Sequence, residues 1–157
     1  MKFTTEVFWL LTTSTSLVSG LVAHRDPTPK TSACTQLVQS LGIAKVQGPL
    51  SVPYFASQAD YWNAVQSSYD PSCVVYPESA QDVSTALKTI KAAGSRFAVK
   101  AGGHNPNTFF SSVESGVLID LNSMTQKSYD PSTTLGSYQP GGVFGDIYNT
   151  SINTAEQ

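Results

Sequence analysis

The segment from Phe97 to Pro106 holds the residue types best suited to chemistry. Gly102 and Gly103 follow a β-branched and aromatic run, and glycines there let main-chain N–H groups approach a phosphate with no Cβ in the way. His104 comes next, and a neutral imidazole is a good nucleophile. The pattern predicts a diphosphate-binding bend that carries a reactive histidine. Taken alone, a Gly-Gly-His triplet is more typical of a plain turn with a solvated histidine.

A strand, helix, strand unit near residues 73–100 would position this bend. Strands are expected at 73–76 and 97–100, because both are β-branched or aromatic runs. Between them, Ser79 is suited to cap the start of a helix and Gly94 to end it. Four apolar residues recur there at helical spacing: Val83, Ala86, Leu87 and Ile90. We expect the strands to be parallel and the connection right-handed.

The other elements follow from periodicity and turn residues. They are helices at 33–41, 60–67 and from 144 onward, and strands at 117–121 and 135–139. The loop at 101–116 is long for a compact domain, and such loops usually have a function. Asp130 and Pro131 predict a turn. Together these elements predict an α+β fold built around an α/β lobe.

Residues 1–20 have the outline of a secretory signal peptide, with cleavage at 20 or as late as 23. Lys2 precedes a short apolar centre and small residues, although Glu6 departs from the pattern. The apolar stretch is too short for a membrane anchor. Residues 21–31 are charged and contain two prolines, which favours a flexible lead-in to a domain at 32–157. We therefore expect a secreted protein.

The two cysteines, Cys34 and Cys73, fit an exported protein. An even pair in such a chain favours a disulfide, and no CxxC or neighbouring histidine supports a metal site. Asn149 begins a glycosylation sequon with Thr150 and Ser151. A disulfide and one glycan are therefore predicted, and no metal.

Length and charge exclude some classes of protein. With 157 residues, 40% of them hydrophobic, the chain can build one domain but not a two-domain enzyme. The net charge is -2 and no basic stripe is present, so no nucleic-acid partner is expected. We further expect a monomer and no membrane partner.

The segment from Phe97 to Pro106 resembles the histidyl-flavin motif of the berberine-bridge-enzyme-like branch of the vanillyl-alcohol-oxidase superfamily, in its fungal form. Three further segments resemble the family's motifs in the same order: 71–77 with the helix after it, 116–121 and 139–148. The match spans residues 34 to 148. The resemblance implies the N-terminal part of a PCMH-type FAD-binding domain, whose second half and substrate domain are absent.

The resemblance also implies FAD as the cofactor, with the imidazole of His104 bonded to the 8α carbon of the flavin. The residues implied at the pyrophosphate are Lys100, Ala101, Gly102, Gly103 and Asn105. Lys100 is also compatible with an exposed charge at a strand end. The family's cysteinyl-flavin motif is not reached, so a covalent flavin would be held by His104 alone. No catalytic residue is assigned.

Two functions follow from these observations. The first is the flavin-binding portion of an oxidoreductase that moves a hydride from a small alcohol, sugar or secondary metabolite to FAD, which oxygen then reoxidises. The alternative is a truncated, non-catalytic secreted protein or binding module derived from such an enzyme.

A nicotinamide-binding domain is disfavoured because the loop lacks GxGxxG. Asp120 and Asp146 are expected to be structural carboxylates.

Overall fold

The computed structural model describes residues 32–155, with side chains described up to residue 149. The helices are α1 (Ala33–Leu41), α2 (Val52–Ala59), α3 (Ala64–Ser67), α4 (Ala80–Ala93) and α5 (Phe144–Ala155). The strands are β1 (Val46–Gln47), β2 (Cys73–Val75), β3 (Phe97–Lys100), β4 (Val117–Asp120), β5 (Lys127–Asp130) and β6 (Leu135–Tyr138), with a 3-10 turn η1 (Leu121–Ser123). The predicted signal peptide and lead-in lie outside the described residues.

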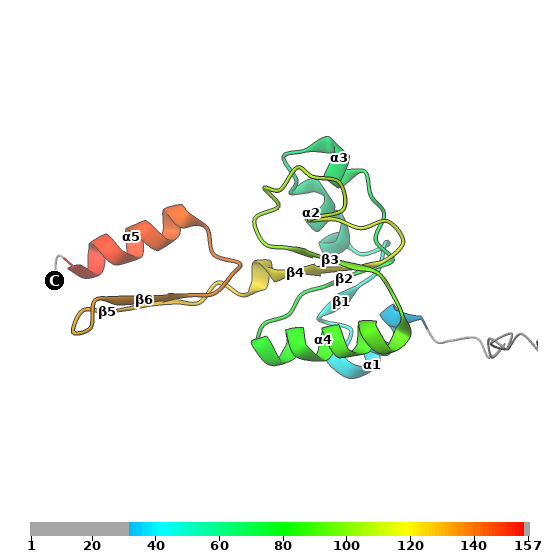
Figure 1. The fold of residues 1–157 in the computed structure, drawn as a ribbon, viewed down its shortest axis with the longest axis horizontal. Helices are drawn as coiled ribbons and strands as arrows, with labels where there is room; N and C mark the ends of the chain where they lie inside the picture. Colours follow the sequence, from blue (N-terminus) through cyan, green and yellow to red (C-terminus); the bar gives the residue numbers. More distant parts are fainter. Residues whose placement is uncertain (1–31, 156–157) are drawn as a thin grey trace, which may run out of the picture.

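A four-stranded sheet forms the centre of residues 32–123, which we call the sheet lobe. Its strand order is β1-β2-β4-β3, in which β2, β4 and β3 are parallel and β1 is antiparallel to β2. Helices α1 and α4 cover one face, and α2 and α3 cover the other (Figure 1). The predicted strand, helix, strand unit is confirmed as parallel. However, β4 lies between its two strands and pairs with both.

Side chains alternate between the two faces of this sheet, as the pleat of a strand requires. Val75 and Ile119 pack with α1 and α4 in one apolar cluster. Val74 and Leu118 point the other way and pack with Tyr54 of α2 in a second cluster. All four strand residues are fully buried. Strands β2 and β4 are therefore covered on both faces, which explains why they read as unbroken apolar runs.

The predicted ends of the α4 helix are confirmed by its hydrogen bonds. The hydroxyl of Ser79 accepts from the backbone N–H of Asp82 at 3.1 Å. At the other end, Gly94 takes the left-handed conformation with φ +66° and donates to the carbonyls of Ile90 and Lys91. Both caps satisfy backbone groups that a helix leaves unpaired at its ends. The length of α4 is thus determined by local residues.

The helix predicted at 60–67 is wrong in its bounds. Helix α2 begins earlier, where Ser51 caps it and Pro53 lies in its first turn, and it ends with Asp60 as its C-cap. Only a short helix follows, capped by Asn63. The apolar residues counted as one helical face separate in the structure, because Tyr61 is buried in the connection between α2 and α3.

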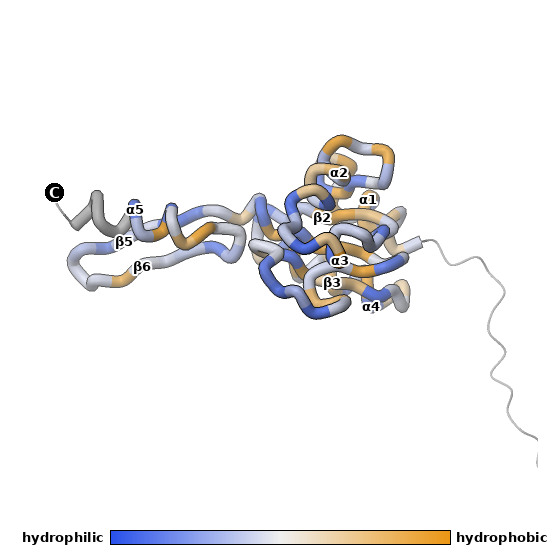
Figure 2. The backbone as a smooth tube through the Cα atoms, turned by 90° about the horizontal axis from the view of Figure 1, so that it is seen from above, coloured by the Kyte–Doolittle hydropathy of each residue, from blue (hydrophilic) through white to orange (hydrophobic). Residues whose placement is uncertain are grey.

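Residues 127–155 form what we call the arm, in which an antiparallel hairpin of β5 and β6 is followed by α5. The arm projects away from the sheet lobe in both views (Figures 1 and 2). The strand predicted at 135–139 and the helix from 144 are confirmed. At the predicted turn, the carboxylate of Asp130 accepts hydrogen bonds from the Ser132 N–H and the Thr133 hydroxyl. Strand β5 was not predicted, since its sequence lacks a β-branched run.

The predicted disulfide is confirmed between Cys34 of α1 and Cys73 of β2. It joins a helix to the sheet face that this helix covers. Asn149 is exposed on α5, and its glycosylation stays a prediction. Within residues 32–155, no helix is long and apolar enough to cross a membrane.

Candidate functional site

The candidate site lies at the carboxyl edge of the parallel strands. Because β2, β3 and β4 run the same way, the segments that follow them emerge on one side of the sheet. The glycine bend follows β3 directly, and Asp120 ends β4 beside Lys100 in the strand pairing. Ligands of open parallel sheets bind outside this edge. The fold therefore places the Gly-Gly-His bend where a ligand site is expected.

Gly103 makes the bend possible, since it is buried with φ +64°. A side chain is disfavoured in this left-handed conformation. An added Cβ would also lie 3.2 Å from the Tyr61 ring and 3.3 Å from the Lys100 side chain. Gly102, in contrast, is exposed, and its nearest neighbour would be the His104 ring at 3.7 Å. One glycine fits against the core while the other faces outward.

The backbone of the bend presents unused hydrogen-bond donors. Among the described residues, none accepts a hydrogen bond from the backbone N–H of Gly102, Gly103 or His104. Further along the loop, by contrast, the Asn107 N–H donates to the Asn105 side chain and the Phe110 N–H donates to the Asn107 carbonyl. Consecutive free N–H groups after a strand are a donor set suited to a diphosphate.

His104 is exposed at the outer side of the bend. Its ring lies 6.2 Å from the Trp62 ring, centroid to centroid, at an angle of 36°. No hydrogen-bond partner holds the imidazole within the part of the chain that the structure describes. Both ring nitrogens are therefore free to meet a ligand. The predicted role of His104 in covalent attachment stays a prediction.

Asn105 and Ala101, also predicted at the site, lie in the same exposed loop. The Asn105 side-chain oxygen accepts from the Asn107 N–H at 3.0 Å, and the Asn105 carbonyl accepts from the Ser111 hydroxyl at 3.2 Å. Asn105 thus helps to shape the loop. A contact of Asn105 or Ala101 with a pyrophosphate stays a prediction.

Lys100 is not an exposed charge at a strand end, because its side chain is 0% exposed. Its ammonium donates to the Ser57 carbonyl at 2.8 Å, to the Asp60 carboxylate at 3.1 Å and to the Asp120 carboxylate at 3.3 Å. It also lies 4.6 Å from the centroid of the Tyr61 ring. The cation is paired with protein groups, as burial of a charge requires.

Asp120 is structural, as expected from its place at the end of a strand. It is fully buried and accepts hydrogen bonds from the Ser57 hydroxyl, from Lys100 and from the Asn122 N–H. Nearby, the Tyr61 hydroxyl donates to the Ser111 carbonyl. Burial raises the pKa of Tyr61 to about 12, so its hydroxyl remains a donor throughout the neutral range.

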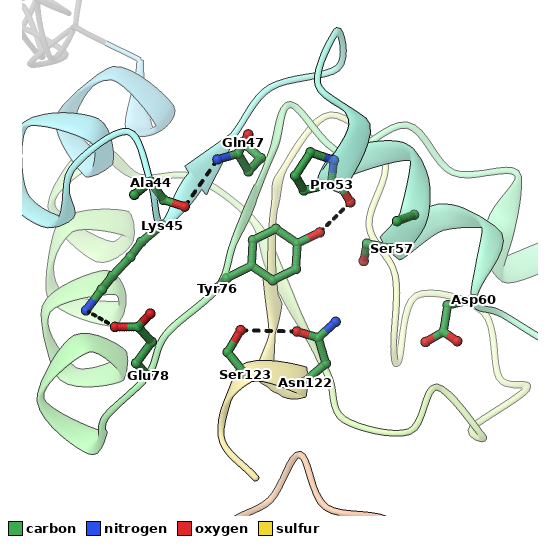
Figure 3. Close-up of a pocket in the computed structure, with 11 residues that line it drawn as sticks. Ala44, Lys45, Gln47, Pro53, Ser57, Asp60, Tyr76, Glu78, Asn122 and Ser123 are labelled. Atoms are coloured by element: carbon green, nitrogen blue, oxygen red, sulfur yellow. Dashed lines mark hydrogen bonds and ion pairs between the residues drawn. The ribbon is translucent and has the colours of Figure 1, made fainter.

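A cavity of about 650 Å³ lies at the same edge, beside the ends of β2 and β4 (Figure 3). The Tyr76 hydroxyl donates to the Pro53 carbonyl at 2.6 Å, and burial raises the pKa of Tyr76 to about 12. On the opposite side, the Lys45 ammonium pairs with Glu78 at 3.0 Å and with Asp82 at 2.7 Å. The hydrogen bond from Lys45 lowers the pKa of Asp82. Polar groups from α2, from η1 and from the segments next to β1 and β2 therefore line the cavity.

Sequence reasoning assigned no site role to the cavity residues, which include Ser57 and Asp60, or to Tyr61 beneath the bend. Because a helix was predicted at 60–67, α2 was missed. The end of α2 contributes Ser57 and its C-cap Asp60. The available signal was the Ser51 cap followed by Pro53, which is typical of a helix start. No group of three or more metal-ligating side chains is found in the described part of the chain.

Sequence comparison finds known proteins that are similar to this chain. Residues 71–153, more than half of the chain, match the family described as FAD binding domain. An FAD-dependent monooxygenase of Emericella nidulans is 38% identical over 121 residues, which cover 76% of this chain and 25% of the relative. One of Aspergillus calidoustus is 36% identical over 119 residues, covering 73% and 23%. The chain thus spans about a quarter of the length of these curated relatives.

Solved structures share the fold. Wild-type Phl p 4.0202, a glucose dehydrogenase, superposes with a TM-score of 0.70 at 19% identity, covering 78% of this chain and 26% of that one. A variant of a BBE-like protein of Physcomitrella patens gives a TM-score of 0.64 at 25% identity, covering 79% and 26%. The expected α/β lobe of a PCMH-type domain, present in part, is therefore confirmed.

Proposed function

Because the chain belongs to the FAD binding domain family, we propose that its glycine bend binds the pyrophosphate of FAD and that His104 anchors the flavin. One observation carries this proposal: the bend presents free N–H groups at Gly102, Gly103 and His104 at the carboxyl edge of the sheet. Such groups, with no Cβ in the way, match the oxygens of a diphosphate in charge and direction.

The residues present fit this cofactor. Gly103 lies where a Cβ would meet Tyr61 and Lys100, so the bend keeps its shape only with glycine. Gly102 and His104 are exposed and face outward from that bend. Bound FAD would supply a two-electron acceptor for hydride removal. The chain's own contribution is to bind the diphosphate and to present one imidazole.

We further propose that the link to His104 is covalent. A neutral imidazole nitrogen of His104 would be the nucleophile and would be joined to the 8α carbon of the flavin. One C–H bond of the 8-methyl group and the imidazole N–H bond would break and release two protons, and dioxygen would take up these protons and the two electrons as hydrogen peroxide. The free ring nitrogens and the exposure of His104 support this role.

The reaction proposed for the whole protein is hydride removal from a small alcohol, sugar or secondary metabolite, with oxygen as the final acceptor. Relatives named as FAD-dependent monooxygenases and a glucose dehydrogenase of the same fold support a redox reaction on a small molecule. We also propose that the protein is secreted and monomeric. The disulfide between Cys34 and Cys73 supports an oxidising compartment.

The proposal is tested by expressing the chain with FAD and looking for flavin fluorescence in the protein band of a denaturing gel. The chain has a second histidine, His24, which serves as a matched control. We expect the band in the wild type and in His24→Ala, and its loss in His104→Ala. A fluorescent His104→Ala band, or no fluorescent band in the wild type, would contradict covalent attachment through His104.

A second measurement distinguishes the proposed function from the alternative, a non-catalytic binding module. Titration of the purified chain with FAD, followed by quenching of flavin fluorescence, measures binding without chemistry. We expect stoichiometric binding that His104→Ala retains, because the N–H groups of the bend are unchanged. A chain that stays folded and colourless with excess FAD would favour the alternative.

A further inference from the structure

We infer that Lys100 is a positioning residue of this site, and that its buried ammonium holds the Gly-Gly-His loop in place from below. The inference rests on the proposed function, since the loop matters for FAD. Lys100 is the last residue of β3, immediately before the loop, and its side chain is 0% exposed. A cation this deeply buried must be compensated by several acceptors. The elements that supply these acceptors are the elements that the Lys100 ammonium holds together.

The acceptors belong to two elements that are distant in sequence. The Ser57 carbonyl and the Asp60 carboxylate lie at the end of α2, at 2.8 and 3.1 Å from the ammonium. The Asp120 carboxylate lies at the end of β4, at 3.3 Å, and accepts a further hydrogen bond from the Ser57 hydroxyl. Lys100 therefore ties the end of α2 to the ends of β3 and β4, directly under the bend.

Tyr61 extends this connection to both ends of the loop. Its ring lies 4.6 Å from the Lys100 ammonium, within the range of a cation–π contact. The same ring lies against Gly103 at the start of the loop, and its hydroxyl donates to the Ser111 carbonyl near the loop's end. Displacement of the cation would therefore release Tyr61, and with it the shape of the bend that carries His104.

This geometry distinguishes positioning from direct ligation. While the ammonium binds Ser57, Asp60 and Asp120, its donors are directed at protein oxygens, and the Lys100 side chain has no exposed surface. A lysine that ligates a phosphate acts as an accessible point charge. The Lys100 ammonium is instead enclosed by protein acceptors, as expected for a residue that holds neighbouring elements in place. Direct contact with the diphosphate is the competing role that the test must exclude.

The variant for the test is Lys100→Met with Asp120→Asn. Lys100→Met alone would leave a buried carboxylate without its cation, and such a protein is at risk of failing to fold. The double variant removes both buried charges and keeps an oxygen at residue 120 for the Ser57 hydroxyl. Asp120→Asn alone and Lys88→Met, which changes an exposed lysine on α4, are the controls. Thermal unfolding shows that each variant is folded.

The first readout needs no flavin. Phe109 and Phe110 are exposed in the loop, so chymotrypsin cleavage after them reports how firmly the loop is held. In the double variant we expect cleavage to be faster by roughly tenfold, with Lys88→Met unchanged, because a looser loop opens more often. Equal cleavage rates in the double variant and the wild type would overturn the positioning role, even if the chain proves not to bind FAD.

The second readout separates binding from attachment. With FAD saturating, we expect the double variant to attach flavin to His104 roughly tenfold more slowly, because a misplaced nucleophile loses its alignment. The salt dependence of FAD affinity should stay as in the wild type. Weaker binding with a reduced salt dependence would identify Lys100 as a phosphate ligand and overturn the inference, because exposed charge contacts are the ones that salt screens.

Discussion

The sheet lobe and the arm differ in where their apolar side chains go. In the lobe, every residue of β2 and β4 is buried. Their side chains pack in two apolar clusters on opposite faces of the sheet. In the arm, every residue of β6 is exposed, and Phe144 and Tyr148 of α5 are 76% and 64% exposed. Figure 2 shows the same contrast in hydropathy between the hairpin and the lobe.

The difference shows that a segment can form regular secondary structure without burying an apolar core. The arm has a complete hairpin register and a turn stabilised by Asp130, so its local hydrogen bonds are satisfied. In the described part of the chain, β6 and the aromatic side chains of α5 stay exposed, and local hydrogen bonds contribute little without burial of apolar area. The lobe holds the candidate site, and its elements are fixed by packing on both faces. A site that must hold a bend to a few tenths of an ångström needs that second kind of support.

The largest effect is expected from removing the disulfide. Its closed loop spans 39 residues, and on the chain-entropy model Cys34→Ser with Cys73→Ser would lower the free energy of unfolding by about 4 kcal/mol. Chemical denaturation of the oxidised wild type and the double variant measures this change. Proteolysis of the arm serves as the internal control and should be unaffected. A loss below about 1 kcal/mol would show that the lobe does not depend on this link.

Two leucines offer a matched test of the comparison itself. Leu118 is fully buried in β4, whereas Leu135 of β6 is 66% exposed. Leu118→Ala should lower the free energy of unfolding by about 3 kcal/mol through lost burial and a cavity. Leu135→Ala should change it by less than about 0.5 kcal/mol. Similar losses for both variants, measured by denaturant titration, would mean that the arm is packed in solution.

Substitution of Gly103 and of Gly145 compares a strained, crowded glycine with one that has open space around it. Gly103→Ala should destabilise the lobe by about 1 to 2 kcal/mol, because alanine is disfavoured at φ +64° and its Cβ would press on Tyr61. It should also weaken FAD binding. Gly145→Ala, where an added Cβ meets nothing within 4 Å, should instead favour α5 by up to about 1 kcal/mol. Thermal unfolding measures both, and a neutral Gly103→Ala would argue against a tight bend.

The smallest effect concerns alkaline pH. Burial raises the pKa values of Tyr61 and Tyr76 to about 12, above the ordinary 10 of a tyrosine. The folded lobe therefore keeps protons that the unfolded chain releases, and this stabilisation is complete below pH 10 and is lost as the pH rises to 12. Over that interval the free energy of unfolding of the wild type should fall more steeply with pH than that of Tyr61→Phe. Tyr138→Phe in the exposed hairpin is the control, and it should leave the profile unchanged.

Much of the fold was predictable because its signals are local. The ends of α4 follow from Ser79 and Gly94, and the turn of the hairpin follows from Asp130. Strands β3 and β4 were recognisable by their composition. What failed was the region after residue 50, where a helical face was counted from residues that the structure separates. Periodicity cannot show that a chain leaves a helix to bury one tyrosine.

The candidate site divides in the same way. The bend itself, with exposed Gly102 and His104 and buried Gly103, was named from residue types alone, because glycine allows unusual backbone shapes and histidine supplies reactive nitrogens. The ion pairs beneath it were not. Lys100 was expected to be exposed or on a phosphate, and nothing local indicated that Asp60 and Asp120 would surround its ammonium.

The sequence by itself determined the strand, helix, strand unit near residues 73–100, the glycine bend with its histidine, and the pair of cysteines, since each depends on neighbouring residues or on residue chemistry. Only the tertiary structure decided that β4 lies between β2 and β3, and that α2 meets the carboxyl edge of the sheet. These choices depend on contacts between residues 20 or more positions apart, such as Phe97 with Val117 and Lys100 with Asp60 and Ser57. Burial of apolar faces and pairing of buried charges select them together.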